Sequence, residues 1–155
     1  MSPSAARDVL APADGNGEAG MAALTLEMKL EEIARADRRY ALEAYHFVFE
    51  ALDYVLAHPG CRKSPASRHI TVTELLEGMR RFGLAHYGPL ARCVFESWGV
   101  FSTEDFGEIV FRLIDSHLLH QGEHDRKEDF SGAFDFREAF DEGYRPLLEA
   151  GGSLS

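Results

Sequence analysis

The stretch from Ser97 to Leu119, SWGVFSTEDFGEIVFRLIDSHLL, is the part of the sequence that most constrains the fold. Gly99 ends one helical segment, Ser102 is typical of a helix N-cap, and apolar residues then recur at helical spacing. The acidic residues just after Ser102 favour a helix start there, because negative charge interacts well with the N-terminal end of the helix dipole. The stretch therefore predicts two helices joined by a short turn.

Similar signals recur along the chain and predict further helices. Thr25 can cap a first short helix, and Thr71 and Glu74 have the spacing of a capping box. Predicted helices cover about residues 24–37, 38–58, 72–87, 89–99, 103–119 and a last turn from Asp135 to about Asp141. We therefore predict a mainly α fold, a single compact helical domain of five to six helices spanning 23–148, between disordered tails at 1–22 and 149–155.

Two further features refine this architecture. A winged-helix-like variant would place a small β-hairpin between about Leu118 and Phe136. The apolar faces of the predicted helices also define an expected core. Its members are Phe47, Leu52, Leu76, Phe95, Trp98, Phe106, Val110 and Leu113.

Composition excludes several classes of protein. No run of about 18 apolar residues is present, which argues against a membrane span, and the N-terminal residues lack the apolar segment of a signal peptide. Cys61 and Cys93 have no C-x-x-C spacing, so a reduced, cytoplasmic location is expected. We expect Cys93 to be buried in its helix, and Cys61, beside Arg62 and Lys63, to be the more reactive thiol.

The net charge of −10 is concentrated in residues 101–155, which carry thirteen acidic and five basic side chains. The densest part also contains Phe134, Phe136 and Phe140, which we expect to attach this segment to the helical core. The predicted docking surface for a basic protein partner consists of Glu123, Asp125, Glu128, Asp129, Asp135 and Glu138. The leading hypothesis is a protein-interaction module, although a surface that serves only solubility explains the same charge.

A nucleic-acid binder or regulator is the first alternative. The helix–turn–helix outline of 89–119 fits it poorly, because Arg112 is the one cation on the second helix and four acidic residues oppose it. A better basic surface lies in the centre of the chain. Its residues are Arg62, Lys63, Arg68, Arg80 and Arg81.

A metal-dependent enzyme is the second alternative. His117, His120 and His124 lie within eight residues of each other, and imidazole groups suit zinc, but their spacing matches no familiar metal motif. The chain also lacks a nucleophile elbow and a phosphate-binding P-loop. We therefore predict no enzymatic activity and no cofactor.

Several blocks of the sequence resemble a known family. They are RYALEAYHFVFEAL, HITVTELLEGMRRFGLAHYGPLARCVFESWG, SWGVFSTEDFGEIVFRLIDSHLL and EDFSGAFDFREAF. The chain is similar in these blocks to a small family of conserved hypothetical proteins found largely in planctomycetes and verrucomicrobia. The resemblance covers about 33–140, and it implies a shared fold but carries no information on activity, cofactor or partner.

Overall fold

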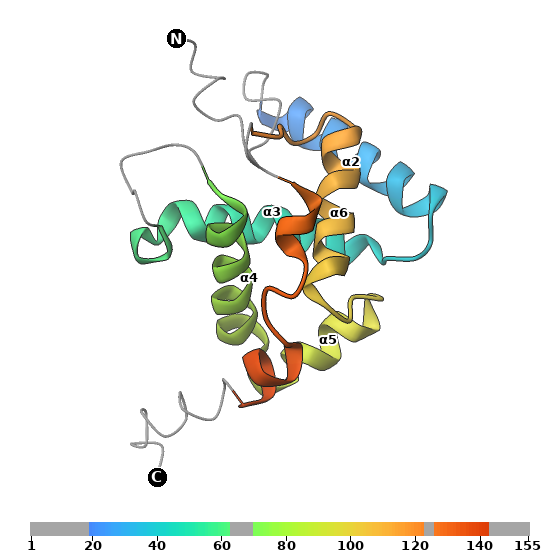
Figure 1. Ribbon diagram of the computed structural model, residues 1–155. Coiled ribbons are helices and arrows are strands. Elements are labelled where there is room, and N and C mark those ends of the chain that lie inside the picture. The colour runs from blue at the N-terminus through green and yellow to red at the C-terminus, as the bar shows by residue number, and fades with distance from the viewer. Residues whose placement is uncertain (1–18, 63–69, 123–125, 143–155) are drawn as a thin grey trace.

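The computed structural model describes residues 19–62, 70–122 and 126–142, and the fold there is mainly α, as predicted (Figure 1). The five α-helices of these residues are α2 (Ala19–Ala36), α3 (Leu42–Ala57), α4 (Val72–Tyr87), α5 (Ala91–Ser97) and α6 (Thr103–Asp115). Four single turns of helix accompany them: η1 (Pro59–Cys61), η2 (Gly88–Leu90), η3 (Lys127–Phe130) and the π-helical η4 (Arg137–Glu142). None of the helices in the described ranges has the length and apolar character needed to cross a lipid bilayer.

The helices pack around a C-terminal strap, defined here as residues 126–142. In Figure 1, α4 and α6 stand upright on either side of this strap, and α3 crosses behind them. The strap contacts both flanking helices through η3, while η4 reaches α4 and α5 at the lower end. α2 packs against α3. The segment richest in acidic residues is thus built into the helical domain.

Local signals place α4 as predicted. The backbone N–H of Glu74 donates to Thr71 Oγ1 at 3.1 Å, and the backbone N–H of Thr71 donates to Glu74 Oε1 at 2.9 Å. Together these bonds form the predicted capping box, which satisfies two N–H groups that the first helical turn would otherwise leave unpaired.

The first two helices differ from the prediction at their starts. α2 begins at Ala19, within the predicted tail and before Thr25, because alanine and methionine extend a helix readily. α3 begins at Leu42, later than expected. Ala41 is held extended there, and its N–H donates to the carbonyl oxygen of Trp98 at 3.0 Å. A contact distant in sequence therefore sets where α3 starts.

The turn between α5 and α6 depends on Gly99. This glycine has a φ of 89°, a conformation that side chains disfavour, and a β-carbon there would clash with the carbonyl oxygen of Arg39. Val100 is fully buried just after it. The predicted helix–turn–helix outline is therefore present, and its turn packs inward against the start of α3.

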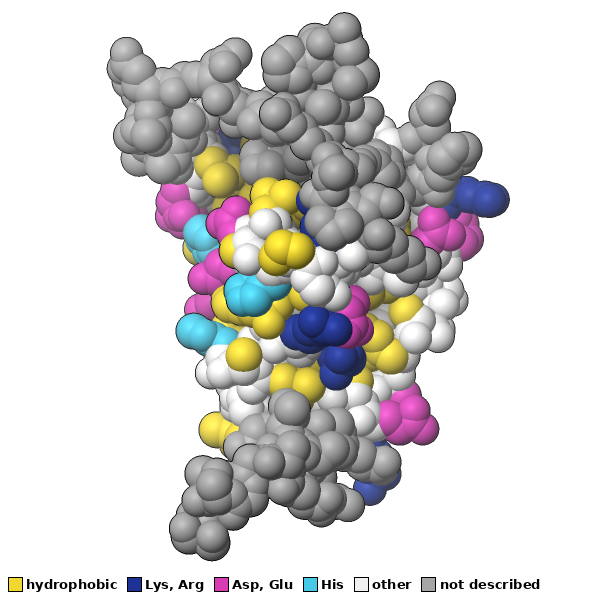
Figure 2. Space-filling view, turned by 90° about the vertical axis from the view of Figure 1, so that its left-hand side faces the viewer, with side chains coloured by type: hydrophobic (Ala, Val, Ile, Leu, Met, Phe, Trp, Pro, Cys, Tyr) yellow, Lys and Arg dark blue, Asp and Glu magenta, His cyan; other side chains and the backbone are white. Residues whose placement is uncertain are grey.

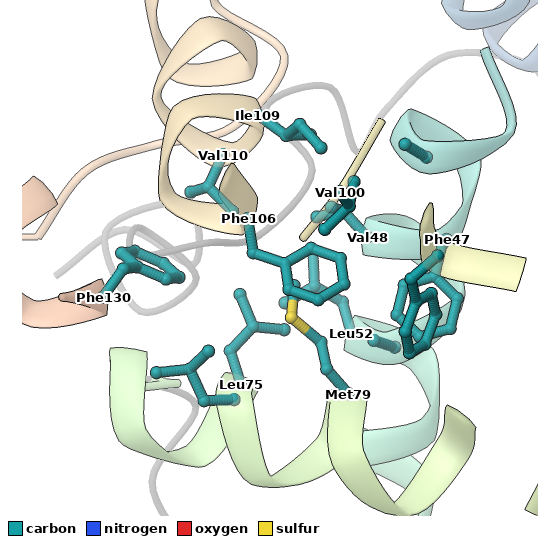
Figure 3. Close-up of a cluster of buried hydrophobic side chains, with 14 of the residues drawn as sticks. Phe47, Val48, Leu52, Leu75, Met79, Val100, Phe106, Ile109, Val110 and Phe130 are labelled. Carbon is teal, nitrogen blue, oxygen red and sulfur yellow. The ribbon is translucent and has the colours of Figure 1, made fainter. Parts of the chain in front are cut away.

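Phenylalanine rings form the centre of the core (Figure 3). The ring centroid of Phe47 lies 5.0 Å from that of Phe95 and 5.8 Å from that of Phe106. Figure 3 shows apolar side chains of α3, α4 and α6 converging beside these rings. Seven predicted core residues are buried: Phe47, Leu52, Leu76, Phe95, Phe106, Val110 and Leu113. The eighth, Trp98, is partly buried, and its indole packs against the rings of Phe47, Tyr87 and Phe95.

The predicted β-hairpin is wrong for the described part of 118–136, which contains η3 and only a single β-bridge residue, Leu119. Side chains of α6 occupy the backbone donors that a paired strand would use. Glu104 accepts hydrogen bonds from Ser131 Oγ and the Gly132 N–H, and Thr103 Oγ1 accepts one from the Ala133 N–H. The winged-helix variant therefore has no wing in the described residues.

Candidate functional site

The strap is held from beneath by its phenylalanines. Phe130, Phe136 and Phe140 are buried, so the predicted attachment is confirmed for the latter two. Phe130 lies directly on Gly107 of α6, where a β-carbon would come within 2.8 Å of the Phe130 Cβ. Phe134 is half-buried, with its ring centroid 5.8 Å from that of Phe140. Because these rings fix the strap from inside, its outer side is left for other contacts.

The outer side of the strap carries the predicted docking carboxylates. Glu128, Asp129, Asp135 and Glu138 are all exposed. Asp129 accepts a hydrogen bond from the backbone N–H of Arg126, and Asp135 accepts one from that of Glu138, each at 3.1 Å. In the described part of the chain, the carboxylates of Glu128 and Glu138 have no ion-pair partner. The two remaining members of the predicted surface, Glu123 and Asp125, lie outside the described residues.

Ion pairs tie the strap to its neighbours and reduce its charge. Lys127 Nζ lies 3.0 Å from Glu108 Oε2 of α6, and Arg92 Nη2 of α5 lies 2.8 Å from Asp141 Oδ2. Residues 126–142 contain six acidic and three basic side chains, a net charge of −3. The surface is therefore acidic, but less so than the sequence of the whole C-terminal third suggests.

The predicted basic surface is only partly brought together. Arg80 and Arg81 both bind the Glu77 carboxylate, at 2.6 Å and 2.7 Å, as neighbours on α4. The pKa of the Glu77 carboxyl is lowered, chiefly by the hydrogen bond from Arg80. Arg62 is half-buried after η1, and Lys63 and Arg68 lie outside the described residues. Figure 2 shows this face, with Lys and Arg side chains at its centre and a carboxylate beside them.

A strip of aromatic and histidine rings lies on the same face and was not predicted. We call it the ring strip, and it comprises His58, Tyr54, Phe82, His86 and Tyr87. The His58 ring stacks on Tyr54 with centroids 3.9 Å apart, and the His86 ring stacks on Phe82 at 5.2 Å. The centroids of Tyr54 and Phe82 lie 5.6 Å apart and join the two pairs across α3 and α4. His58 and His86 are exposed, and the other three rings are half-buried.

Arg112 is the cation on the second helix of the predicted helix–turn–helix. Its side chain belongs to a network of hydrogen bonds and ion pairs between α6 and the start of α3. Its guanidinium donates to Tyr45 Oη at 3.1 Å and pairs with Asp37 at 2.7 Å. The guanidinium groups of Arg112 and Arg39 each lie 5.0 Å from the centroid of the Tyr40 ring. These contacts engage Arg112 within the fold, so its side chain is not positioned to contact the phosphates or bases of DNA.

Asp105 completes this network. It accepts hydrogen bonds from Tyr40 Oη at 2.6 Å, from Arg39 and from the backbone N–H of Phe101. Burial, and then the bond to Asp105, raise the pKa of the Tyr40 hydroxyl above its ordinary value. Asp105 is one of the acidic residues after Ser102 that were expected to favour the start of a helix, and it also joins α6 to the start of α3.

The cysteines fall differently from the prediction, and the histidines of the metal-site alternative are only partly within the described residues. His117 and His120 are exposed after α6, His124 lies outside the described residues, and no group of metal-ligating side chains is present within those residues. Cys93 is exposed and Cys61 is buried, the reverse of the expectation. Cys93 lies on the outward side of the short α5, while Cys61 is covered in η1, where Arg81 Nη1 lies 3.8 Å from its sulfur.

Comparison of this chain with protein-family models, curated proteins and solved structures finds no match.

Proposed function

We propose that this protein is a non-catalytic interaction module that uses the outer side of the C-terminal strap to dock a protein partner with a basic surface. One observation carries the proposal: the strap is anchored by buried phenylalanines while its carboxylates project outward. A partner can therefore bind there without displacing any core side chain.

The charge distribution supports a basic partner. Exposed carboxylates on a fixed backbone attract cationic groups over about one Debye length and accelerate association at low salt. Asp129 and Asp135 are already oriented by backbone N–H groups, so less conformational freedom is lost when a partner binds them. Glu128 and Glu138 add two exposed carboxylates on the same segment.

The buried polar groups support binding rather than catalysis. Glu74, Thr103 and Asp105 are the buried polar or charged residues in the described part of the chain. Glu74 belongs to the capping box of α4, Thr103 holds the strap, and Asp105 joins α6 to Tyr40. Each has a structural role that accounts for its burial. The cytoplasmic location and the family resemblance stay predictions.

Reversal of two strap charges tests the proposal. Glu128→Lys/Asp129→Lys is compared with Glu31→Lys/Glu32→Lys, a matched double reversal at adjacent exposed residues on α2. Immobilised protein captures partners from a lysate of the native host, and mass spectrometry identifies them. Association rates of the purified partner are then measured across a salt series.

We expect the strap variant to lose a basic partner that the α2 variant retains, with association slowed at least about tenfold at low salt. The melting temperature of the α2 variant should stay close to that of the wild type, because Glu31 and Glu32 are exposed. The strap variant should melt only a few degrees lower, because Asp129→Lys removes one exposed hydrogen bond to the Arg126 N–H. Equal capture by both variants would show that the carboxylates serve solubility alone. Capture of no basic protein by the wild type would also refute the proposal.

A further inference from the structure

We propose a second binding site, separate from the strap: the ring strip and the adjacent arginines of α4 bind single-stranded nucleic acid by stacking bases on the rings. Proteins that hold single strands without reading their sequence combine aromatic side chains that stack bases with cations that contact phosphates. Both components occur together on the face formed by α4 and the end of α3 (Figure 2).

The rings are fixed in orientation before any ligand binds. His58 Nδ1 lies 2.9 Å from the carbonyl oxygen of Tyr54, so a protonated Nδ1 donates a hydrogen bond that holds the imidazole flat against the Tyr54 ring. Phe82 is anchored from beneath by Phe47, with centroids 5.5 Å apart. Because the rings are held in this way, a base that stacks on an exposed ring orders few additional side chains.

The two histidine rings are the most exposed members of the strip. Each has one face stacked on a neighbour, at interplanar angles of 16° for His58 and 18° for His86. Both are exposed, so a base can extend the stack at either end. Imidazole is among the side chains on which unpaired bases stack in RNA complexes.

Arg81 supplies positive charge beside the strip. Its Nε binds Glu77 and its Nη1 lies against Cys61, which hold the guanidinium between α4 and η1. The side chain is 42 % exposed, and its Nη2 has no hydrogen-bond partner among the described residues. One carboxylate, Glu77, faces two guanidinium groups from Arg80 and Arg81, so this cluster keeps a net positive charge suited to phosphate.

Negative charge bounds the strip at its other end. Burial, and then the charge of Glu50, raise the pKa of the Tyr87 hydroxyl, which places a carboxylate near that ring. A bound strand would therefore place its phosphates beside Arg81 and stack its bases on the exposed rings of His58 and His86. A duplex cannot stack its paired bases on such a strip. An acidic peptide would use the arginines but not the rings.

Fluorescence anisotropy with labelled oligonucleotides tests the site in the full chain. The probes are single strands of about 12 nucleotides, oligo-U and oligo-dT, together with a duplex of the same length, at about 50 mM salt. The variants are His58→Ala/His86→Ala, its ring-retaining counterpart His58→Phe/His86→Phe, and Arg81→Glu. Arg38→Glu is the matched control, because Arg38 is an exposed arginine between α2 and α3.

We expect both single strands to bind more tightly than the duplex. His58→Ala/His86→Ala should weaken binding about tenfold or more, and the phenylalanine pair should largely restore it. Arg81→Glu should weaken binding about tenfold, while Arg38→Glu should change it less than about twofold. Circular dichroism verifies that each variant is folded.

Several results would overturn the proposal. They are no binding of either single strand, preference for the duplex, equal loss with Arg38→Glu, and equal affinity of the alanine and phenylalanine pairs. Displacement of the oligonucleotide by polyglutamate at equal charge concentration would also overturn it, because the face would then recognise charge alone. None of these results bears on the docking of a basic protein at the strap.

Discussion

Replacement of Phe106 by alanine should remove a large part of the folding stability. The side chain is 0 % exposed, and its ring centroid lies 5.5 Å from that of Phe95, 5.8 Å from Phe47 and 5.9 Å from Phe136. Removal of a buried phenylalanine costs about 3–5 kcal/mol through lost burial and the cavity that remains. Three lost ring pairs, at about 0.5–1.5 kcal/mol each, place the expected loss near the upper end of that range.

The expected loss is large compared with the whole stability of a domain, about 5–15 kcal/mol. At about 2–4 °C per kcal/mol for a chain of this size, the melting temperature should fall by about 8–20 °C. Urea unfolding followed by the fluorescence of Trp98 measures the change, because its indole lies 5.5 Å from the Phe95 ring, next to the site.

Phe101→Ala is the matched control. Phe101 is 61 % exposed in the turn before α6, so its removal should change the free energy of unfolding by less than about 0.5 kcal/mol. A loss below about 1.5 kcal/mol for Phe106→Ala would refute the reasoning, since that value is too small for a well-packed ring. So would equal losses for the two variants.

Two further predictions concern polar contacts. Thr71→Ala should lower the free energy of unfolding in urea by about 0.5–2 kcal/mol, because α4 loses its N-cap. Thr71→Ser should restore most of the loss, because serine can also cap a helix. Equal losses for both variants would contradict the capping role. The pKa of Tyr40 is raised above its ordinary 10.0, so its contribution to stability is fully present below about pH 10 and is lost as the pH rises beyond it. Wild type should therefore lose more unfolding free energy than Tyr40→Phe between about pH 9 and pH 11, whereas parallel pH profiles would contradict this assignment.

The sequence predicts the helices best where their signals lie within a few residues. The bounds of α4 follow from Thr71, Glu74 and the Gly88-Pro89 pair, all of which act on their nearest neighbours. The start of α3 could not be predicted in this way, because the contact between Ala41 and Trp98 joins distant parts of the chain. The strap differs from a hairpin for the same reason: Glu104 and Thr103 of α6 bind its backbone.

Of the two candidate surfaces, one could be predicted from the sequence and the other could not. The outward carboxylates of the strap could be predicted, because phenylalanines interspersed with acidic residues suggest one buried and one exposed side. The ring strip could not be predicted as one continuous surface. Tyr54 and His58, like Phe82 and His86, are four residues apart on a predicted helix, which indicates two stacked pairs. Only the packing of α3 on α4 brings Tyr54 and Phe82 together.

The strap also has a consequence for synthesis on the ribosome. Phe140 packs against Phe95, 45 residues earlier in the chain, and is made 34 residues after Phe106. At about 5–20 residues per second, those 34 residues take about 2–7 s to translate. During that interval the rings of α3, α5 and α6 lack the side chains that cover them. The nascent helices therefore present an unfilled apolar surface, of the kind that molecular chaperones bind, until the strap emerges.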